Sequence, residues 1–465
     1  MNKHYLKFGA SAFMWLLGTT LVSGQDLTTL PGFTLNDLSP FKAPGQSWSL
    51  AASVSLNPSA AVNELKIENG TGVLVNFPGK KNQGTDLLTN GTHGDAIIEL
   101  DYLLAKGASS GVYLQGIYEI QLRDSWDVKN PLSTDNGGIY ELYAPRQNAS
   151  KAPGLWQHLR IEFQAPRFDA SGRKISNARM LSVTLNGVLI HDNVELPAPA
   201  KGPNDAEKPV GGLKFQGDQG AVAFKNIKIS KLPEALLNGG QRGKDMPNPI
   251  YIDAPSNTMI RSFVDLARDV RVVHAISVGS PTQVHYSYDL DNGMLVQGWR
   301  GDFIDATPMW DGRGNGTSKA RGSVTRFSIQ PVPAIAQLST PESPWLADST
   351  GTGFKTKGYV MDAEDRPEFK YNMYGAQVTD AIKVVSNGQG LSRTISTDKP
   401  VANLYVLLAV APDVKELAKG LYLIDGQSFY LKMDDMADRP IIRDVNGKKE
   451  LIVLLRNKLS YSILF

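Results

Sequence analysis

The chain has 465 residues, which is enough for two ordinary domains with a hydrophobic core in each. It contains no cysteine, so disulfide bonds and thiolate metal sites are excluded. Its formal net charge is only +2. Nucleic acid is therefore not an expected partner, because affinity for nucleic acid depends on a strongly basic surface.

The first 25 residues have the order of a secretory signal peptide. Lys3 and Lys7 precede an apolar stretch, and the small residues Ser23 and Gly24 follow it. We therefore expect residues 1–24 to be removed and the mature protein, which is close to neutral, to be periplasmic or secreted. The apolar stretch is shorter than the roughly 20 residues of a membrane-spanning helix, and no later segment resembles one, so no membrane span is expected.

Alternating apolar and polar residues predict β-strands through the first half of the chain. Helical periodicity is nearly absent, and Gly, Pro and Asn separate the short strands. This pattern predicts an all-β protein with a β-sandwich in its first half. Asn186–Gly187 is a strong signal for a type I′ hairpin turn. The strands are expected at residues 96–104, 110–125, 158–163, 180–190, 213–216 and 222–229.

A change of composition predicts the domain boundary. Residues 233–249 (PEALLNGGQRGKDMPNP) have the Gly, Pro and polar content of a linker, which separates a first domain at 25–232 from a second at 250–465. The second domain is again expected to be rich in strands, and residues 359–371 to form a strand, a turn and a strand. The only helices expected are short, at residues 256–268 and 413–418.

The strand pair at residues 110–125 (SGVYLQGIYEIQLRDS) has an unusual second face. Its apolar residues can face a core, and Gly116 allows a tight turn between the two strands. The opposite face carries amide, carboxylate, guanidinium and phenol groups, from Tyr113, Gln115, Glu119, Gln121 and Arg123. A row of planar hydrogen-bonding groups suits a polyhydroxylated ligand, so this pair is the first candidate for a carbohydrate site.

The first half resembles the family of 3-keto-disaccharide hydrolase domains, also described as 3-keto-glucoside 1,2-lyase and 3-keto-2-hydroxy-glucal hydratase domains. The resemblance covers about residues 38–229 and is carried by four stretches in the family order. They lie at 110–125, 137–169, 185–196 (LNGVLIHDNVEL) and 211–229 (GGLKFQGDQGAVAFKNIKI). The family implies a concanavalin-like jelly roll of two antiparallel sheets, with the substrate on the concave face. One departure is Gln219, which stands before Gly220 where members commonly carry His.

The resemblance also implies a chemistry. Oxidation of a glucoside at C3 acidifies the proton on C2, so that one carboxylate can remove it; the glycosidic oxygen then leaves by β-elimination and water adds to the enolone. Glu119 is expected to be the base, with Gln121 and Arg123 as its catalytic partners. The expected substrate-binding residues are Tyr113, Gln115, Trp156, His158, Gln216 and Asp218.

Two other functions remain open. A conventional glycosidase on a jelly roll would resemble the pattern E-x-D-x-x-E, where this chain has Glu119, Gln121 and Asp124. Gln121 cannot ionise, and Asp124 falls on the opposite side of the strand unless a bulge re-aims it, so the two carboxyl groups of double displacement are poorly matched. A non-catalytic carbohydrate-binding protein could use the same face. Glu119 and Arg123 would then be a cross-strand surface network, and Asp218 a turn residue.

The histidines show no metal-ligand spacing, so no metal site is predicted. A divalent cation held by carboxylates such as Glu119 and Asp218 is left open as an alternative. For His158 a solvent-facing position is favoured over a ligand contact, and for Trp156 a place in the core is the alternative to stacking on a sugar ring.

Residues 272–322 resemble a module of other secreted bacterial proteins, which implies no particular activity. Residues 311–322 lack the end of a phosphate-binding loop and the ligands of a calcium loop, and are expected to form a surface loop. Aromatic side chains beside Asp and Arg are a candidate sugar subsite here, although ordinary packing is favoured. The candidate residues are Trp299, Arg300, Asp302, Asp305, Trp310 and Asp311.

Overall fold

The structure is a computed structural model that describes residues 33–200, 206–237, 248–310, 312–434 and 437–465. The signal peptide expected at residues 1–24 lies outside the described residues, as do residues 238–247 of the expected linker and Asp311. No helix within the described ranges is long and apolar enough to cross a membrane.

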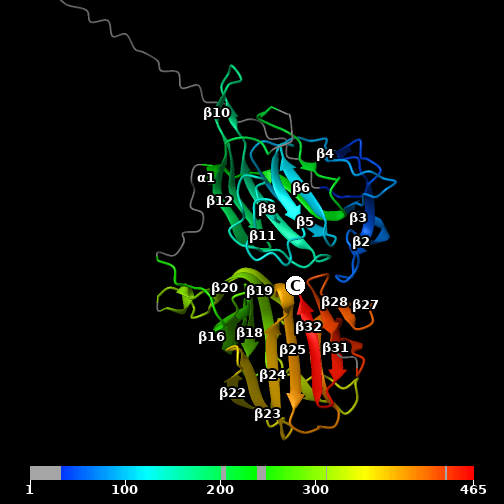
Figure 1. Cartoon of the computed structure of the whole chain (residues 1–465), viewed down its shortest axis with the longest axis vertical. Coiled ribbons are helices and arrows are strands. Elements are labelled where there is room, and N and C mark those ends of the chain that lie inside the picture. Colours follow the sequence, from blue (N-terminus) through cyan, green and yellow to red (C-terminus); the bar gives the residue numbers. More distant parts are fainter. Residues whose placement is uncertain (1–32, 201–205, 238–247, 311, 435–436) are drawn as a thin grey trace, which may run out of the picture.

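The described chain is built almost entirely of antiparallel strands, in two halves that lie one above the other in Figure 1. We refer to strands β1–β14 as the N-terminal sandwich and to strands β15–β32 as the C-terminal half. The one α-helix that the described residues form is the single turn α1 (Glu234–Leu237). The all-β fold predicted from the alternating pattern is confirmed.

Two sheets form the N-terminal sandwich. The five-stranded sheet has the order β1 (Phe41–Lys42), β4 (Leu87–Thr89), β13 (Lys214–Phe215), β6 (Ser109–Leu114) and β7 (Tyr118–Arg123). The seven-stranded sheet has the order β12 (Val188–Leu196), β11 (Ala178–Leu185), β8 (Gln157–Gln164), β5 (Ala96–Leu104), β14 (Val222–Lys231), β3 (Lys66–Asn76) and β2 (Trp48–Ser55). A small hairpin joins β9 (Arg167–Phe168) to β10 (Lys174–Ser176).

The core of the sandwich lies between these sheets, because each strand turns alternate side chains inward. Ile98 and Leu100 of β5 pack in one cluster with Val112 of β6 and Ile120 of β7, all of them buried. The residues between them in the sequence therefore lie on the outer faces of the sandwich. The expected hairpin turn at Asn186–Gly187 is also confirmed, with φ angles of 52° and 81°.

Three sheets form the C-terminal half. The first has the order β15 (Tyr251–Ile252), β19 (Met294–Asp305), β18 (Val284–Asp289), β17 (Val270–Gly279) and β16 (Thr258–Ala267), with β20 (Lys319–Arg326) also paired to β19. The second has the order β21 (Ile335–Gln337), β26 (Leu404–Ala411), β31 (Lys448–Leu454) and β30 (Ile441–Val445). The third has the order β22 (Lys355–Met361), β23 (Pro367–Met373), β24 (Ala376–Val384), β25 (Gly390–Thr397), β32 (Lys458–Leu464), β29 (Phe429–Met433), β28 (Leu421–Ile424) and β27 (Val414–Ala418). Two 3₁₀ turns, Thr307–Met309 and Ser386–Gly388, complete the elements.

The prediction of two short helices in this half is wrong, because both segments are strands. Residues 258–267 form β16, in which Val264 and Leu266 are buried while Phe263 just before them is exposed. Residues 414–418 form β27, which pairs with β28. Pairing with a neighbouring strand decides the conformation here, and local sequence preference is too weak to oppose it.

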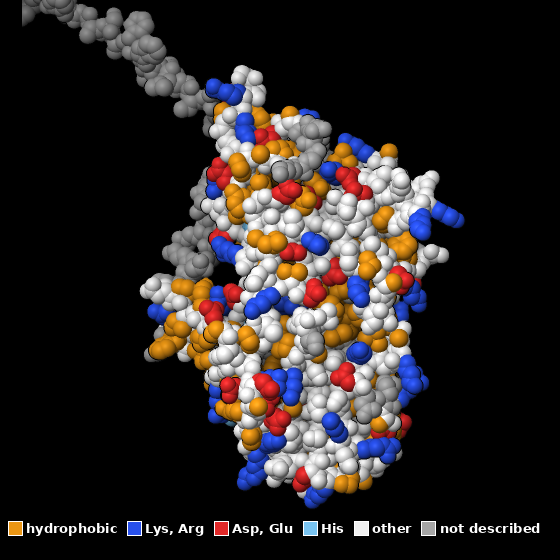
Figure 2. Space-filling model, in the orientation of Figure 1, with side chains coloured by type: hydrophobic (Ala, Val, Ile, Leu, Met, Phe, Trp, Pro, Cys, Tyr) orange, Lys and Arg blue, Asp and Glu red, His pale blue; other side chains and the backbone are white. Residues whose placement is uncertain are grey.

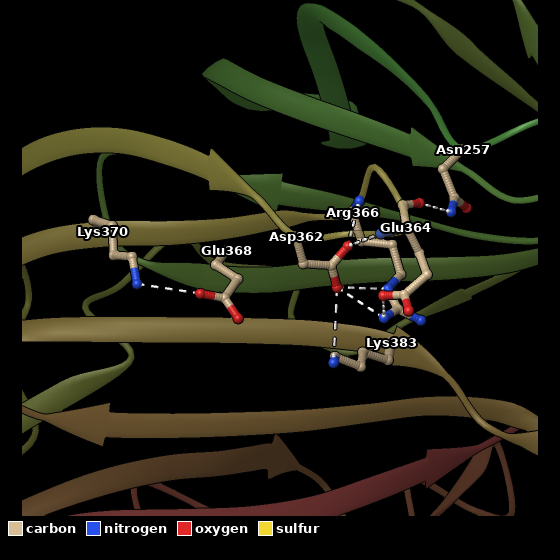
Figure 3. A network of polar contacts seen from close by, with 7 residues as sticks. All are labelled: Asn257, Asp362, Glu364, Arg366, Glu368, Lys370 and Lys383. Carbon is tan, nitrogen blue, oxygen red and sulfur yellow. Dashed lines mark hydrogen bonds and ion pairs between the residues drawn. The ribbon is translucent and has the colours of Figure 1, made fainter.

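The strand, turn and strand expected at residues 359–371 is confirmed as the β22–β23 hairpin, and a polar network holds its turn (Figure 3). The Asp362 carboxylate accepts hydrogen bonds from the backbone N–H groups of Glu364 and Arg366, at 3.0 and 2.9 Å. Lys383 of β24 lies 3.7 Å from the same carboxylate. Asn257 donates to the Glu364 carbonyl oxygen at 2.6 Å, which ties the turn to the segment before β16.

Direct contacts join the N-terminal sandwich to the C-terminal half. The Trp126 indole N–H donates to the Phe465 carbonyl oxygen at 2.8 Å, and the Tyr430 hydroxyl donates to the Pro153 carbonyl oxygen at 3.0 Å. The side chains of both halves also share one buried apolar cluster, formed by Trp126, Ala152, Leu155, Leu421, Leu423 and Tyr430. Burial of these side chains holds the two halves against each other.

Candidate functional site

The candidate site begins with the β6–β7 hairpin. Tyr113 lies opposite Glu119 and Gly111 opposite Gln121, and the turn between the strands has positive φ angles at Gln115 and Gly116. Val112 and Ile120 point into the core, so that their neighbours lie on the outer face of the five-stranded sheet. We call this surface the Glu119 face.

Gly111 makes room for the Glu119 carboxylate. A Cβ atom at residue 111 would lie 2.3 Å from Glu119 Oε1 and 3.0 Å from the Tyr113 ring carbon Cε2. The carboxylate therefore rests directly over the backbone of β6, where any larger residue would displace it. Sequence reasoning missed Gly111, although it lies within the strand pair at residues 110–125.

Glu119 is 2 % exposed, and its surroundings raise the pKa of its carboxyl group to about 7. Burial is the main cause, because it disfavours the charged form. A hydrogen bond from the Tyr113 hydroxyl and the charge of Lys214 lower this pKa, and the charges of Asp86 and Asp218 raise it. The result is a carboxyl group that is half ionised near neutral pH, as a general base requires.

Lys214 of β13 supplies the positive charge next to Glu119. It lies opposite Tyr113 in the strand register, and its Nζ atom is 3.9 Å from the centre of the Tyr113 ring. The same Nζ atom is 3.2 Å from Oδ2 of Asp86, the residue before β4. Burial and the nearby charge of Glu119 raise the pKa of the Tyr113 hydroxyl, which therefore stays protonated and able to donate. Sequence reasoning missed Lys214, although it alternates with Phe215 and so shares the face of Gln216.

Gln121 and Arg123 continue the Glu119 face along β7. The Gln121 amide donates to the Ser109 hydroxyl at 2.8 Å and is nearly buried. The Arg123 side chain is half exposed and turns toward the following loop, where its Nη1 atom lies 3.7 Å from Asp135 Oδ1. Of the three expected catalytic residues, Glu119 and Gln121 are thus held in place and Arg123 lies at the margin.

The other expected binding residues near this face have different surroundings. The backbone N–H of Gln216 donates to the Gly111 carbonyl oxygen, which extends the pairing of β13 with β6. Asp218 is exposed and lines an open cavity of about 580 Å³ together with Gln219. The Gln115 amide instead donates to the Pro209 carbonyl oxygen at 2.9 Å, so this side chain fastens a loop.

Trp156 and His158 lie on the other side of the sandwich. Leu159, next to His158 on β8, is buried in the core, so His158 points outward from the seven-stranded sheet. The His158 Nδ1 atom is 2.8 Å from Asp101 Oδ1, and Lys225 Nζ lies 4.1 Å from the centre of the Trp156 ring. This placement corrects the expectation that the two residues join Glu119, because the core of the sandwich separates them from it.

Among the described residues, no three His, Asp or Glu side chains are grouped so that they could hold a metal ion. A divalent cation at Glu119 and Asp218 would have fewer protein ligands than hard cations usually take.

The candidate sugar subsite of the C-terminal half is divided by the structure. Trp299 is fully buried and stacks against Phe303, with a distance of 5.9 Å between the ring centres. Arg300 is buried as well, whereas Asp302 forms an ion pair with Arg321 at 2.8 Å and Asp305 accepts the backbone N–H of Thr307. Trp310 is 60 % exposed. Figure 2 shows apolar side chains gathered on the part of the surface where Figure 1 places β16 and β20. The described candidate residues form no common face.

The fold and the Glu119 face together define a two-sheet β-sandwich domain with a buried carboxyl group on one outer face. Residues 34–230 match the family model described as a 3-keto-alpha-glucoside-1,2-lyase-like domain, so this part of the chain is similar to that family. The match confirms the resemblance found in the four sequence stretches.

Several solved structures resemble part of the chain. A provisionally assigned glycosyl hydrolase from Parabacteroides distasonis is 24% identical, with 40% of this chain and 79% of that chain covered and a TM-score of 0.31. A second such protein from the same organism is 18% identical, with coverages of 40% and 89% and a TM-score of 0.27. The carbohydrate binding module CBM66 from Bacillus subtilis is 13% identical, with coverages of 41% and 100% and a TM-score of 0.23. No curated protein matches the chain.

Proposed function

We propose that the N-terminal sandwich cleaves 3-keto-glucosides and 3-keto-disaccharides by elimination followed by hydration, and that it does so after export from the cytoplasm. One observation carries the proposal. Glu119 is a buried carboxyl group with a pKa of about 7, and the Tyr113 hydroxyl and the Lys214 ammonium group beside it are hydrogen-bond donors. Export is supported by the character of residues 1–24 alone.

The reaction needs one base and several donors. The Glu119 carboxylate takes the proton from C2, and the electron pair of that C–H bond moves into the C3 ketone to give an enolate. The Tyr113 hydroxyl and the Lys214 ammonium group stabilise the enolate oxygen, since both lie beside the carboxylate. The enolate then expels the glycosidic oxygen from C1, and this oxygen receives the proton held by Glu119. Addition of water across the resulting double bond gives the free 3-keto sugar.

Gln219 bears on how protons move in this site. Its amide donates to Asp218 Oδ2 at 3.1 Å, and an amide cannot act as a general acid or base at neutral pH. We infer that any proton transfer done by the family His at this position passes to Glu119 and Tyr113 in this chain.

A conventional glycosidase is less well supported. The second carboxylate would be Asp124, but Asp124 Oδ2 accepts the backbone N–H of Gly107 at 2.8 Å and Oδ1 accepts that of Trp126 at 3.4 Å. These hydrogen bonds hold Asp124 to the backbone beyond the end of β7, away from a sugar bound at Glu119. Double displacement needs two carboxyl groups on either side of one bond.

The test compares a 3-keto-glucoside with its unoxidised parent. Enolone absorbance and release of the leaving group are followed with the full-length mature protein, and we expect turnover of the oxidised substrate only. Equal turnover of both substrates would establish a glycosidase, and turnover of neither with binding retained would establish a binding protein.

The Glu119→Gln variant tests the base. We expect it to lose about 10²–10⁴-fold in kcat, which is the usual contribution of a general base. Glu99→Gln is the matched control, since Glu99 lies on the outer face of the opposite sheet, and we expect it to keep its activity. Circular dichroism checks that both variants are folded.

A further inference from the structure

A second cavity, of about 410 Å³, lies where the two halves of the molecule meet. The N-terminal sandwich contributes residues 57–59 and Trp126, and the C-terminal half contributes the β27–β28 turn, β29, β32 and residues 385 and 389. Figure 1 shows β27 and β28 on the side of the C-terminal half that faces β2 and β3. This cavity shares no lining residue with the Glu119 face.

The charges in this cavity are all positive. Lys419 and Lys432 line it, and no Asp or Glu does. Neither lysine forms an ion pair within the described part of the chain. The nearby carboxylates have other partners, since Asp434 accepts the Ser462 hydroxyl at 3.0 Å and Glu416 pairs with Arg439 at 2.7 Å. Two ammonium groups without a counterion favour an anionic ligand.

The cavity also offers neutral hydrogen-bonding groups. Its lining includes the Asn57 and Gln389 amides and the Ser59 hydroxyl. The Asn57 Nδ2 group, the Gln389 amide and the Ser59 hydroxyl have no hydrogen-bond partner among the described residues. Asn57 Oδ1 accepts the backbone N–H of Ser59 at 2.9 Å, which fixes the direction of this loop. Uncommitted donors and acceptors of this kind suit the hydroxyl groups of a sugar.

One wall of the cavity is apolar and rigid. Trp126, Leu421 and Met433 line it, and each is less than a tenth exposed. The indole N–H of Trp126 is held by the Phe465 carbonyl oxygen, so the ring cannot turn away. Such a wall suits the C–H face of a pyranose ring.

We propose that this cavity binds a sugar that carries an anionic group, with Lys419 and Lys432 holding the carboxylate, sulfate or phosphate. Its volume lies within the range of small-molecule sites. The site needs both halves of the chain, because the hydroxyl-binding loop comes from one and the lysines from the other. The proposal does not depend on the reaction proposed for Glu119.

The ligand class is tested by isothermal titration calorimetry on the full-length mature protein at low salt. The probes are glucuronate, glucose 6-phosphate, N-acetylglucosamine 6-sulfate, glucose and inorganic phosphate. We expect at least one anionic sugar to bind about tenfold or more tightly than both glucose and inorganic phosphate. Which sugar binds best identifies the anionic group. Equal binding of glucose, equal binding of inorganic phosphate, or no binding would overturn the proposal.

Variants locate the binding. Lys419→Gln and Lys432→Gln are each expected to weaken the binding of the anionic sugar by about fivefold to tenfold. Each should also make the binding affinity less dependent on salt concentration. Lys357→Gln on β22 is the matched control, because Lys357 is an exposed strand lysine without an ion pair in the described chain. This variant should bind the anionic sugar as tightly as the native protein does. All three lysines are exposed, so the variants should fold. Unchanged binding by the Lys419→Gln/Lys432→Gln double variant would refute the site. Unchanged binding in Glu119→Gln would separate this result from the proposed reaction.

Discussion

The outer faces of the two sheets in the N-terminal sandwich carry similar residues in very different states. On the seven-stranded sheet, burial acts to raise the pKa of Asp101, but hydrogen bonds from His158 and Asn226 hold it below its ordinary value. On the five-stranded sheet, Glu119 is buried and its carboxylate forms no ion pair with any residue that the structure describes, and burial raises its pKa to about 7. The comparison shows that a polar face becomes a candidate for catalysis when a charge on it is left unneutralised.

The difference has a structural cause in the neighbouring strands. Glu99 lies 3.4 Å from Arg160 and 3.8 Å from Lys228, so a cross-strand network meets its charge. At Glu119 the opposite position is taken by Tyr113, and the nearby Gly111 leaves space for the carboxylate, which forms no ion pair with the described residues. The first face is stabilised by pairing, whereas the second is kept reactive at some cost in stability.

The largest change is expected from filling the space over β6. In Gly111→Ala the new methyl group would lie 2.3 Å from Glu119 Oε1, so the carboxylate must move. We expect kcat for the 3-keto substrate to fall about 10²-fold, because a base displaced by an ångström loses its reactive geometry. Calorimetric unfolding should show little change in Tm, since the end of a side chain can shift without moving the backbone. Undiminished kcat would show that Glu119 does not act from this position.

The stability contributed by Glu119 and the stability contributed by Asp101 should depend on pH with opposite signs. As a base, Glu119 works when it is ionised, so kcat/KM should fall about tenfold per pH unit below its pKa of about 7. Because its folded pKa lies above the unfolded value, its contribution to stability is full at acid pH and is lost as the pH rises through 7. Asp101, with a lowered pKa, contributes stability that is instead lost as the pH falls. Chemical denaturation of the native protein and of Glu119→Gln between pH 2 and pH 8 would separate the two, because the Asp101 contribution is lost only below the ordinary Asp pKa of 3.8. Equal pH slopes for the two proteins would contradict this account.

A smaller effect is expected from removing the positive charge near the base. Lys214 lowers the pKa of Glu119, so Lys214→Gln should move the midpoint of the pH–rate profile upward and reduce activity at pH 7 by about threefold to tenfold. Lys228→Gln removes a comparable charge near Glu99 on the opposite sheet and is the control. A midpoint that stays in place would show that Lys214 is too well compensated by Asp86 to influence Glu119.

The strand alternation predicted more of the fold than of the site. It identified the two-sheet sandwich and placed Glu119 and Gln121 on one face, because the period of a strand depends only on neighbouring residues. It could not find Lys214, since the register that sets Lys214 opposite Tyr113 joins strands about 100 residues apart in the chain. The helix expected at residues 256–268 failed for the same reason, as only the pairing with β17 shows that this segment is extended.

The same limit explains why sequence reasoning placed Trp156 and His158 on the wrong face. The smallest predicted effect concerns His158. Alternation shows that His158 faces away from a core but not which of the two outer faces it joins. The structure puts it beside Asp101, so we expect His158→Gln to leave kcat/KM for the 3-keto substrate within about twofold and to cost at most about 1 kcal/mol of stability, as the loss of a half-exposed ion pair does. Steady-state kinetics and urea unfolding measure both quantities. A large loss of activity with normal stability would mean that the seven-stranded face takes part in the reaction, and the contrast between the paired and the unpaired carboxylate would then no longer mark the active face.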